Sequence, residues 1–286
     1  MTPSMSAARA RALAAHVMVT DANNFAPMEI AMLLEPTLNK LNAMRLFGMA
    51  ESLRRFFDGT KPREVAPQEL IAILADAEWL CRENRMLTTR LRKAAFRLTA
   101  CVEDVDYAHA RGLSRPTMLE LASSRWVQAK KNIIFTGPAG VGKSYLACAL
   151  GNKACRDGYA VIYRRASRLL GELGQARVDG TLPLLLRRLA KAQVLIIDDF
   201  GPEPLSAKER RDLIEVLDDR YDISSTVVTS QLEPSLWHGV IGEETVADSF
   251  CDRLVHNAHR IKLKGESIRK EKEKKERLTA EVGSAK

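Results

Sequence analysis

Two hydrophobic patterns divide the chain. Between residues 34 and 97, apolar side chains such as Leu41, Met44 and Leu53 recur at helical spacing, and a break at Gly59–Pro62 separates two helical stretches. From residue 132 onward, short apolar runs of strand length alternate with helical stretches. The runs are Asn132–Thr136, Ala160–Arg164, Val194–Asp198, Ser225–Thr229 and Arg260–Leu263. This alternation predicts an α/β fold with a parallel sheet flanked by helices, preceded by a small all-helical domain.

The same patterns predict how the chain is divided. An Ala-rich stretch over residues 1–33 is typical of a flexible N-terminal extension, and residues 34–97 form the helical domain. Residues 98–131 are a linker with a bridging helix, and residues 132–269 carry the repeated strands and helices. Lysine and glutamate crowd residues 270–286, which is typical of a disordered charged tail.

A glycine-rich loop follows the first predicted strand. Its sequence is Gly137-Pro138-Ala139-Gly140-Val141-Gly142-Lys143-Ser144, and Tyr145 opens a helical stretch. A strand, this loop and a helix are the context of the phosphate-binding P-loop. Backbone N–H groups of such a loop bind phosphate oxygens, Lys143 would contact the β- and γ-phosphates, and the Ser144 hydroxyl would bind Mg²⁺. The sequence therefore predicts a nucleoside triphosphate as ligand.

Two carboxylates follow the apolar run Val194–Ile197. Ligands collect at the carboxyl ends of parallel strands, so this position suits a metal-binding Asp198 and a water-polarising Asp199, as in the Walker B motif. Many such ATPases have glutamate at the second position. The shorter Asp199 would lie farther from the attacking water and slow hydrolysis.

The charge balance points to a polyanionic partner. The 286 residues carry a formal net charge of +8, which favours nucleic acid over a membrane surface. One basic run is opposed only by Glu83 and comprises Arg82, Arg85, Arg90, Arg92, Lys93 and Arg97. We interpret it as a face for the DNA backbone, with a solvated helix flank or an acidic partner as alternatives.

The cysteines are odd in number and scattered, which is typical of reduced thiols in the cytoplasm. No apolar run reaches the length of a membrane span.

Further motifs complete a resemblance to a family. The segments Thr229–Leu232, Asp252–Ile261 and Lys264–Arg269, together with the P-loop, resemble the IstB-like ATP-binding proteins, the transposition helper ATPases of one insertion-sequence class. The resemblance implies an AAA+ ATPase fold, ATP-dependent homo-oligomerisation and binding of double-stranded DNA. It also implies a DDE-type transposase as partner.

The resemblance also suggests roles for three further residues. Arg253 matches the position of an arginine finger, which acts on a neighbouring subunit. Arg269 resembles a nucleotide-sensing arginine. Gln231, or Ser230 beside it, stands at the strand end where AAA+ proteins carry a residue that senses the γ-phosphate or water; an ordinary strand-terminating turn is the alternative.

The sequence thus favours a DNA-stimulated ATPase that oligomerises on duplex DNA, recruits or activates a transposase, and is reset by hydrolysis. A helicase loader of the DnaC type, acting on single-stranded DNA, shares the same ATPase core. A small-molecule kinase could use the same P-loop, but the sequence shows no motif for a second substrate. A DNA-binding scaffold with a vestigial ATPase is disfavoured by the intact Lys143, Ser144 and Asp198.

Overall fold

The structure is a computed structural model, and it describes residues 27–58, 65–107 and 111–268. The chain divides into two compact units, residues 1–85 and 86–286. The boundary falls inside one helix. Arg269, the predicted tail and most of the predicted N-terminal extension lie outside the described residues. Within those described ranges, no helix is both long and apolar enough to cross a membrane.

The first unit is helical and has a small core. Its elements are α2 (Pro27–Ala43), α3 (Phe47–Asp58) and the part of α4 (Pro67–Ala94) before the boundary. Leu38, Ala50 and Leu53 form the buried core. Helices α3 and α4 approach closely at Gly48, where a Cβ atom would lie 2.4 Å from the Ala77 carbonyl oxygen. The small size of Gly48 therefore lets these two helices pack together.

The second unit is built on a parallel sheet. Its strands are β1 (Asn132–Thr136), β2 (Val161–Arg165), β3 (Val194–Phe200), β4 (Ser225–Ser230) and β5 (Ala258–Lys262). The strand order is β2-β3-β4-β1-β5, and every neighbouring pair is parallel. Strand β4 therefore separates the P-loop strand β1 from the Asp198 strand β3. The predicted parallel sheet is confirmed, with strand ends within about two residues of those expected.

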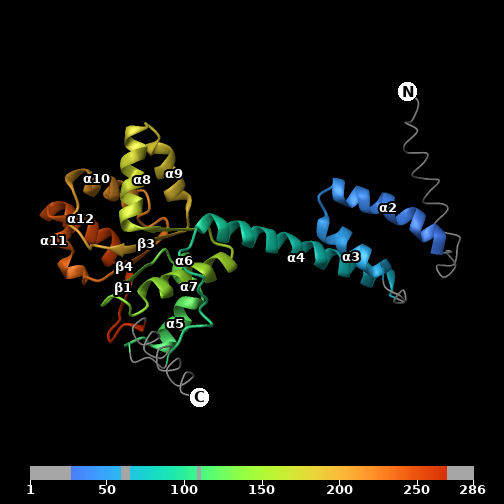
Figure 1. Cartoon of the computed structure of the whole chain (residues 1–286), viewed down its shortest axis with the longest axis horizontal. Coiled ribbons are helices and arrows are strands. Elements are labelled where there is room, and N and C mark those ends of the chain that lie inside the picture. The colour runs from blue at the N-terminus through green and yellow to red at the C-terminus, as the bar shows by residue number, and fades with distance from the viewer. Residues whose placement is uncertain (1–26, 59–64, 108–110, 269–286) are drawn as a thin grey trace, which may run out of the picture. The chain divides into compact units, whose positions relative to one another are not determined.

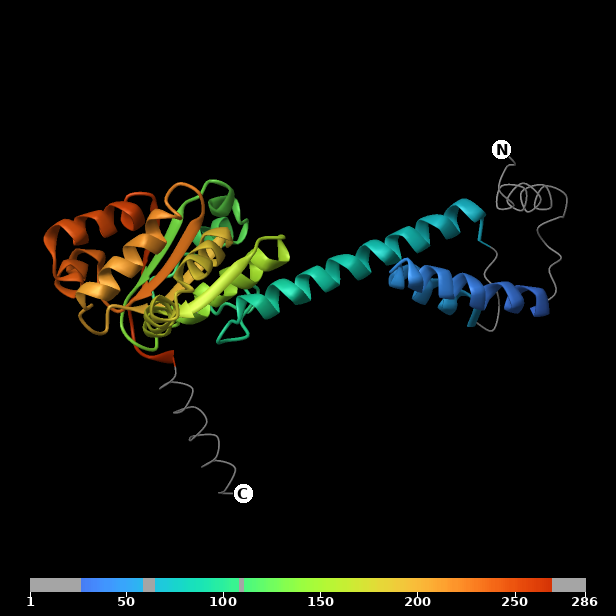
Figure 2. The same cartoon turned by 90° about the horizontal axis from the view of Figure 1, so that it is seen from above.

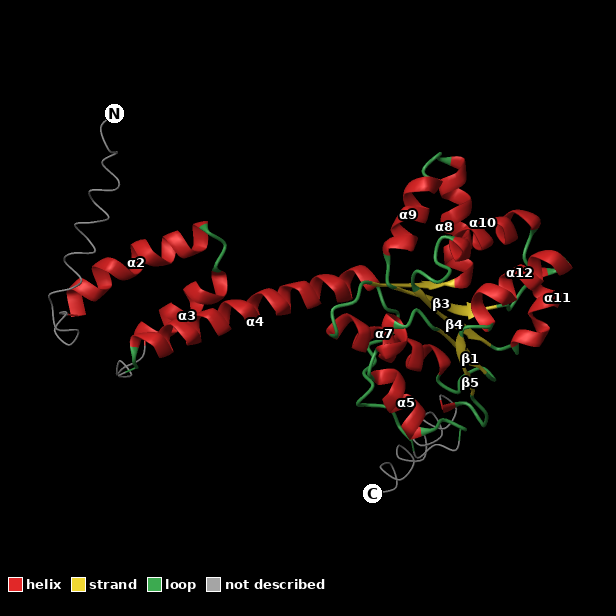
Figure 3. Cartoon of the chain, turned by 180° about the vertical axis from the view of Figure 1, so that it is seen from behind, coloured by secondary structure: helices red, strands yellow, loops and turns green. Residues whose placement is uncertain are grey.

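Helices cover both faces of this sheet (Figures 1 to 3). They are α5 (Arg115–Ala122), α6 (Arg125–Gln128), α7 (Lys143–Arg156), α8 (Ala166–Val178), α9 (Leu182–Lys191), α10 (Ala207–Asp218), α11 (Trp237–Ile241) and α12 (Glu244–Val255), with a short 3₁₀ turn η1 (Pro234–Leu236). Alternate residues of each strand point to opposite faces. Ile133 and Ile196 join the core under α7, whereas Ile134 and Leu195 join the core under α8 to α12.

Strand register brings the polar strand ends to one edge of the sheet. Thr136, the last residue of β1, pairs with Ser230 of β4, and Phe200 of β3 also pairs with Ser230. The glycine-rich loop leaves β1 at this edge. Asp198 and Asp199, near the end of β3, lie at the same edge, which therefore carries the candidate site.

Candidate functional site

The glycine-rich loop joins β1 to α7 and is closed by the segment that follows β5. Its glycines take positive φ angles, and a Cβ atom on Gly140 would lie 2.1 Å from the Ser267 hydroxyl oxygen. The Ile268 N–H donates to the Gly140 carbonyl at 3.1 Å. Glycine is therefore required at position 140 by conformation and by space. The closing segment belongs to the resembling motif Lys264–Arg269.

Lys143, the first residue of α7, folds back over the loop. Its ammonium donates to the carbonyls of Gly137 (2.7 Å) and Pro138 (2.8 Å), and the residue is only 7% exposed. Burial lowers the pKa of Lys143, and the nearby carboxylates of Asp199 and Asp198 oppose that shift. The two predicted carboxylates therefore lie within electrostatic reach of the lysine. A phosphate is a stronger acceptor than these neutral carbonyls, so Lys143 is placed to bind one.

Asp198 is fully buried and held from both sides. The Thr229 hydroxyl donates to Oδ1 and the Tyr163 hydroxyl donates to Oδ2, each at 2.6 Å. Neither Thr229 nor Tyr163 was predicted from the sequence. Thr229 comes directly before Ser230 and Gln231, the two residues singled out at the end of this strand. Tyr163 lies on β2, which carries no recognised motif. No local signal marks Tyr163, because its place beside Asp198 depends on the order of the strands.

Asp199 follows in an unusual backbone conformation. Its φ angle is 62°, in the left-handed region, and the β3–β4 register shifts between Ile197 and Phe200. The Asp199 N–H donates to Thr229 Oγ1 at 2.8 Å, and the Arg165 guanidinium pairs with its carboxylate at 2.9 Å. Residues held in sparsely populated backbone conformations cluster at functional sites. The two neighbouring carboxylates therefore have different partners: that of Asp199 pairs with Arg165, and that of Asp198 is held by hydroxyl groups.

The residues present fit a magnesium ion. Mg²⁺ in nucleotide sites is held by one or two carboxylates and by phosphate oxygens, and it keeps several waters. Asp198 offers a buried carboxylate that forms no ion pair with a described residue, and the Ser144 hydroxyl stands beside Lys143 at the start of α7. Among the described residues, no group of three or more His, Cys, Asp or Glu side chains forms another metal site.

A pocket of about 480 Å³ lies beside the loop. Its walls combine the loop and the start of α7 with the segment before α5; they are Leu98, Asp104, Asp106, Arg111, Gly140, Gly142, Lys143, Ser144, Tyr145 and Ile268. Such a volume is typical of small-molecule sites. The sequence predicted only a linker for residues 98–131, so this wall was missed.

Arg111 is the most constrained side chain of that wall. It is 4% exposed and donates to the carbonyls of Val141 (3.3 Å) and Asp106 (2.9 Å), while its buried Nε has no hydrogen-bond partner in the described structure. Burial lowers its pKa. The guanidinium thus braces the loop from behind, because a Cβ atom on Gly142 would lie 2.6 Å from Arg111 Nη1.

Gln231 and Ser230 occupy different environments. Gln231 is exposed and lines an open pocket of about 630 Å³ together with Gly137 and Pro138. The Ser230 hydroxyl is buried, donates to the Phe200 carbonyl at 2.7 Å and accepts from the Leu232 N–H at 3.1 Å. Gln231 therefore lies beside the glycine-rich loop, whereas the Ser230 hydroxyl holds the backbone at the ends of β3 and β4. Thr229 is the β4 residue that contacts both predicted aspartates, through the Asp198 carboxylate and the Asp199 backbone N–H.

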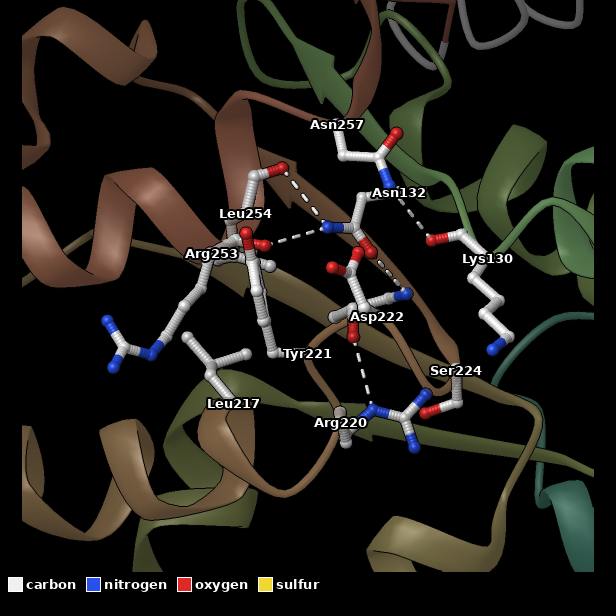
Figure 4. A pocket seen from close by; sticks show the side chains of 11 residues that line it. Lys130, Asn132, Leu217, Arg220, Tyr221, Asp222, Ser224, Arg253, Leu254 and Asn257 are labelled. Carbon is white, nitrogen blue, oxygen red and sulfur yellow. Dashed lines mark hydrogen bonds between the residues drawn. The ribbon is translucent and has the colours of Figure 1, made fainter.

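Arg253 lies at the other end of β1. The Asn132 side chain, at the start of this strand, donates to the Arg253 carbonyl at 3.0 Å. The Arg253 guanidinium donates to the Asp218 carboxylate and to Ser249. Figure 4 shows it pointing away from Asn132, at the rim of a cavity of about 10 Å³. The structure therefore separates Arg253 from the loop of its own chain.

Arg220 lies next to that rim and is buried, and no carboxylate of a described residue pairs with it. Its guanidinium donates to the Thr226 hydroxyl and to the carbonyls of Leu189, Ala192 and Ser225. Burial lowers its pKa. These bonds join the ends of α9 and α10 to the start of β4, beside the rim that carries Arg253.

The predicted basic run is divided between different surroundings. Arg82 pairs with Glu78 at 2.7 Å, and Arg85 lies 4.2 Å above the Phe47 ring. Arg90 is half-buried and donates to the Cys155 carbonyl at 3.2 Å. Three exposed residues form no ion pair with a described residue: Arg92, Lys93 and Arg97. The four-residue spacing of Glu78 and Arg82 is the signal for the pair that was missed.

Comparison with known proteins shows which family the chain belongs to. The family model for IstB-like ATP-binding proteins matches residues 39–276. An insertion sequence ATP-binding protein of Sinorhizobium fredii is 48% identical over 244 residues, covering 85% of this chain and all of that protein. A related protein of Mycobacterium tuberculosis, also from an insertion sequence, is 33% identical and covers 83% of this chain and 96% of its own.

Solved structures share the fold of the second unit. DnaI has a TM-score of 0.51 and 25% identity, covering 57% of this chain and 90% of that chain. A structure of the replication initiator DnaA has a TM-score of 0.50 and 17% identity, covering 60% and 52%. The sheet order and loop are those of AAA+ P-loop ATPases. With most of its length matched, the chain belongs to the family of IstB-like ATP-binding proteins of insertion sequences.

Proposed function

We propose that the protein is a magnesium-dependent ATPase that assembles on duplex DNA and recruits or activates a DDE-type transposase, with hydrolysis resetting the assembly. ATP binding and the insertion-sequence family are established by the matches above. Hydrolysis, duplex DNA, oligomerisation and the transposase are the proposed parts. The names of these relatives refer to insertion sequences, which supports a role beside a transposase.

Each residue at the phosphate edge has a task in this proposal. Lys143 exchanges its loop carbonyls for β- and γ-phosphate oxygens. Asp198 and Ser144 would hold Mg²⁺, which when bound supplies positive charge against the phosphates. Asp199 orients and polarises the attacking water, and its ion pair with Arg165 must open before the carboxylate can accept a proton.

The position of Arg253 carries the assembly part of the proposal. Asn132 holds it at the start of β1, and the loop leaves the end of the same strand. The four steps between the five residues of β1, each of about 3.3 Å, separate the two ends by roughly 13 Å. Its guanidinium also points away from that strand (Figure 4). Arg253 therefore suits the nucleotide site of a second copy, where an arginine stabilises the transition-state charge.

Duplex DNA would contact the exposed part of the basic run. Arg92, Lys93 and Arg97 are exposed without an ion pair to a described residue, so binding a phosphate breaks no ion pair within the described structure. Arg82 and Arg85 are already engaged with Glu78 and Phe47, which makes them weaker candidates. Contacts of this kind follow the backbone and carry no base specificity.

The test measures ATP hydrolysis without DNA, with single-stranded DNA and with duplex DNA. We expect stimulation mainly by the duplex, and no ATP-driven assembly in Lys143→Ala. Lys153→Ala is the matched control, because Lys153 lies on the same helix and pairs with Asp157 on the surface. Stimulation mainly by single strands would favour a helicase loader, which the likeness to DnaI allows. Unchanged assembly in Lys143→Ala would refute the scheme.

A further inference from the structure

Tyr163 is a buried hydroxyl group that the mechanism above leaves unused. It lies in the middle of β2, which pairs with β3 so that Tyr163 stands opposite Ile196. The residue is 5% exposed, and its hydroxyl donates to Asp198 Oδ2 at 2.6 Å. Burial, followed by the hydrogen bond to Asp198, raises the pKa of Tyr163. Because a carboxylate oxygen can only accept, the tyrosine hydroxyl is the donor of this bond.

The Asp198 carboxylate is thus fixed at both oxygens by uncharged donors. Thr229 holds Oδ1 and Tyr163 holds Oδ2, and no cation pairs with it within the described structure. Each carboxylate oxygen can accept more than one contact, so both bonds leave capacity for a metal ion or a metal-bound water. Two hydroxyl groups on different strands set the plane of the carboxylate without neutralising its charge.

The Tyr163 ring is itself supported by Phe96. The two ring centroids lie 6.4 Å apart at an interplanar angle of 59°. Phe96 follows Ala95, whose φ angle of 55° ends α4 with a sharp turn. On α7, a Cβ atom at Gly151 would lie 2.7 Å from both Phe96 and Ile196. Gly151 therefore makes room for Phe96 between α7 and the sheet, directly beside Tyr163.

We propose that Tyr163 is a positioning residue of the magnesium site, whose hydroxyl orients the Asp198 carboxylate, and that Phe96 holds the Tyr163 ring in place. The inference rests on the magnesium–ATP site proposed above. Groups that hydrogen-bond to a metal ligand typically change metal affinity by about 10- to 100-fold when they are removed. A purely structural tyrosine would leave the magnesium dependence unchanged.

The experiment measures binding of a fluorescent ATP analogue over a range of Mg²⁺ concentrations, and also in EDTA. For Tyr163→Phe we expect half-maximal enhancement at about tenfold higher Mg²⁺, with binding in EDTA unchanged. Thr229→Val, which removes the other donor, should shift the curve similarly. Phe96→Leu should give a smaller shift in the same direction. Tyr159→Phe is the matched control, since Tyr159 is a half-buried tyrosine near the same strand and has no bond to Asp198.

The outcomes separate this inference from the proposed function. Asp198→Ala is expected to remove the magnesium enhancement; if it does not, the proposed magnesium site is wrong. If Asp198→Ala removes it while Tyr163→Phe matches wild type, the positioning role alone is wrong. A Tyr163→Phe protein that loses binding equally with and without Mg²⁺ also contradicts the positioning role. A Phe96→Leu protein identical to wild type would overturn the role of Phe96.

Discussion

The two edges of the sheet are built differently. At the phosphate edge, Lys143 and Asp198 are buried and each has two or more internal hydrogen bonds. At the opposite edge, Arg253 sits at a rim and pairs with the half-exposed Asp218. The buried phosphate edge is arranged before any ligand arrives, whereas the ion pair of Arg253 with Asp218 lies within reach of another molecule. The first edge suits binding, and the second suits a response to another molecule.

The sharpest test of this comparison is Arg253→Ala. We expect ATP hydrolysis in the assembled state to fall by about 10³-fold or more, with ATP affinity unchanged. Mixing this variant with Asp199→Ala, which keeps Lys143 for ATP-driven assembly, should restore activity, because one chain then supplies an intact site and the other an intact arginine. Steady-state hydrolysis at varying mixing ratios is the measurement. Loss of ATP binding in Arg253→Ala, or no recovery on mixing, would contradict action across subunits.

A smaller effect is expected from surface charges that belong to neither edge. Replacing Arg92, Lys93 and Arg97 together by alanine should reduce the slope of log affinity for duplex DNA against log salt by about 2.7, or 0.9 per lost phosphate contact. Nucleotide affinity should not change. The control removes equal charge from the exposed Arg187, Arg188 and Lys191 on α9. Equal slopes in both triple variants would place the DNA elsewhere than on the predicted run.

The smallest effect concerns the ion pair that holds Asp199. An exposed pair is worth up to about 1 kcal/mol, so Arg165→Ala should raise hydrolysis without DNA by at most about fivefold. Arg168→Ala is the control, because Arg168 pairs with Glu172 and has no bond to Asp199. Single-turnover hydrolysis rates provide the comparison. A fall in rate as large as that of Asp199→Ala would show that Arg165 serves the nucleotide directly.

Local sequence patterns predicted what is local in the structure. The loop, the strand ending in Asp198 and the alternating elements depend on neighbours in the chain, so apolar periodicity and motif spacing were enough. Strand order decides that Tyr163 and Thr229 flank Asp198, and single-sequence patterns do not carry strand order. The same applies to Arg111, whose contact with Val141 joins a predicted linker to the loop. Contacts between distant segments therefore account for the residues that were missed.

The segment after β5 has a consequence for how the protein is made. Ile268 and Leu263 hydrogen-bond to the loop and to the end of β1, although they are synthesised long after them. A ribosome adds about 5–20 residues per second, so several seconds pass between synthesis of the loop and synthesis of the segment that closes it. Until then β1 is an open edge with unpaired backbone groups. The nascent chain should therefore gain its affinity for ATP abruptly and late, once β5 and the residues after it have left the exit tunnel.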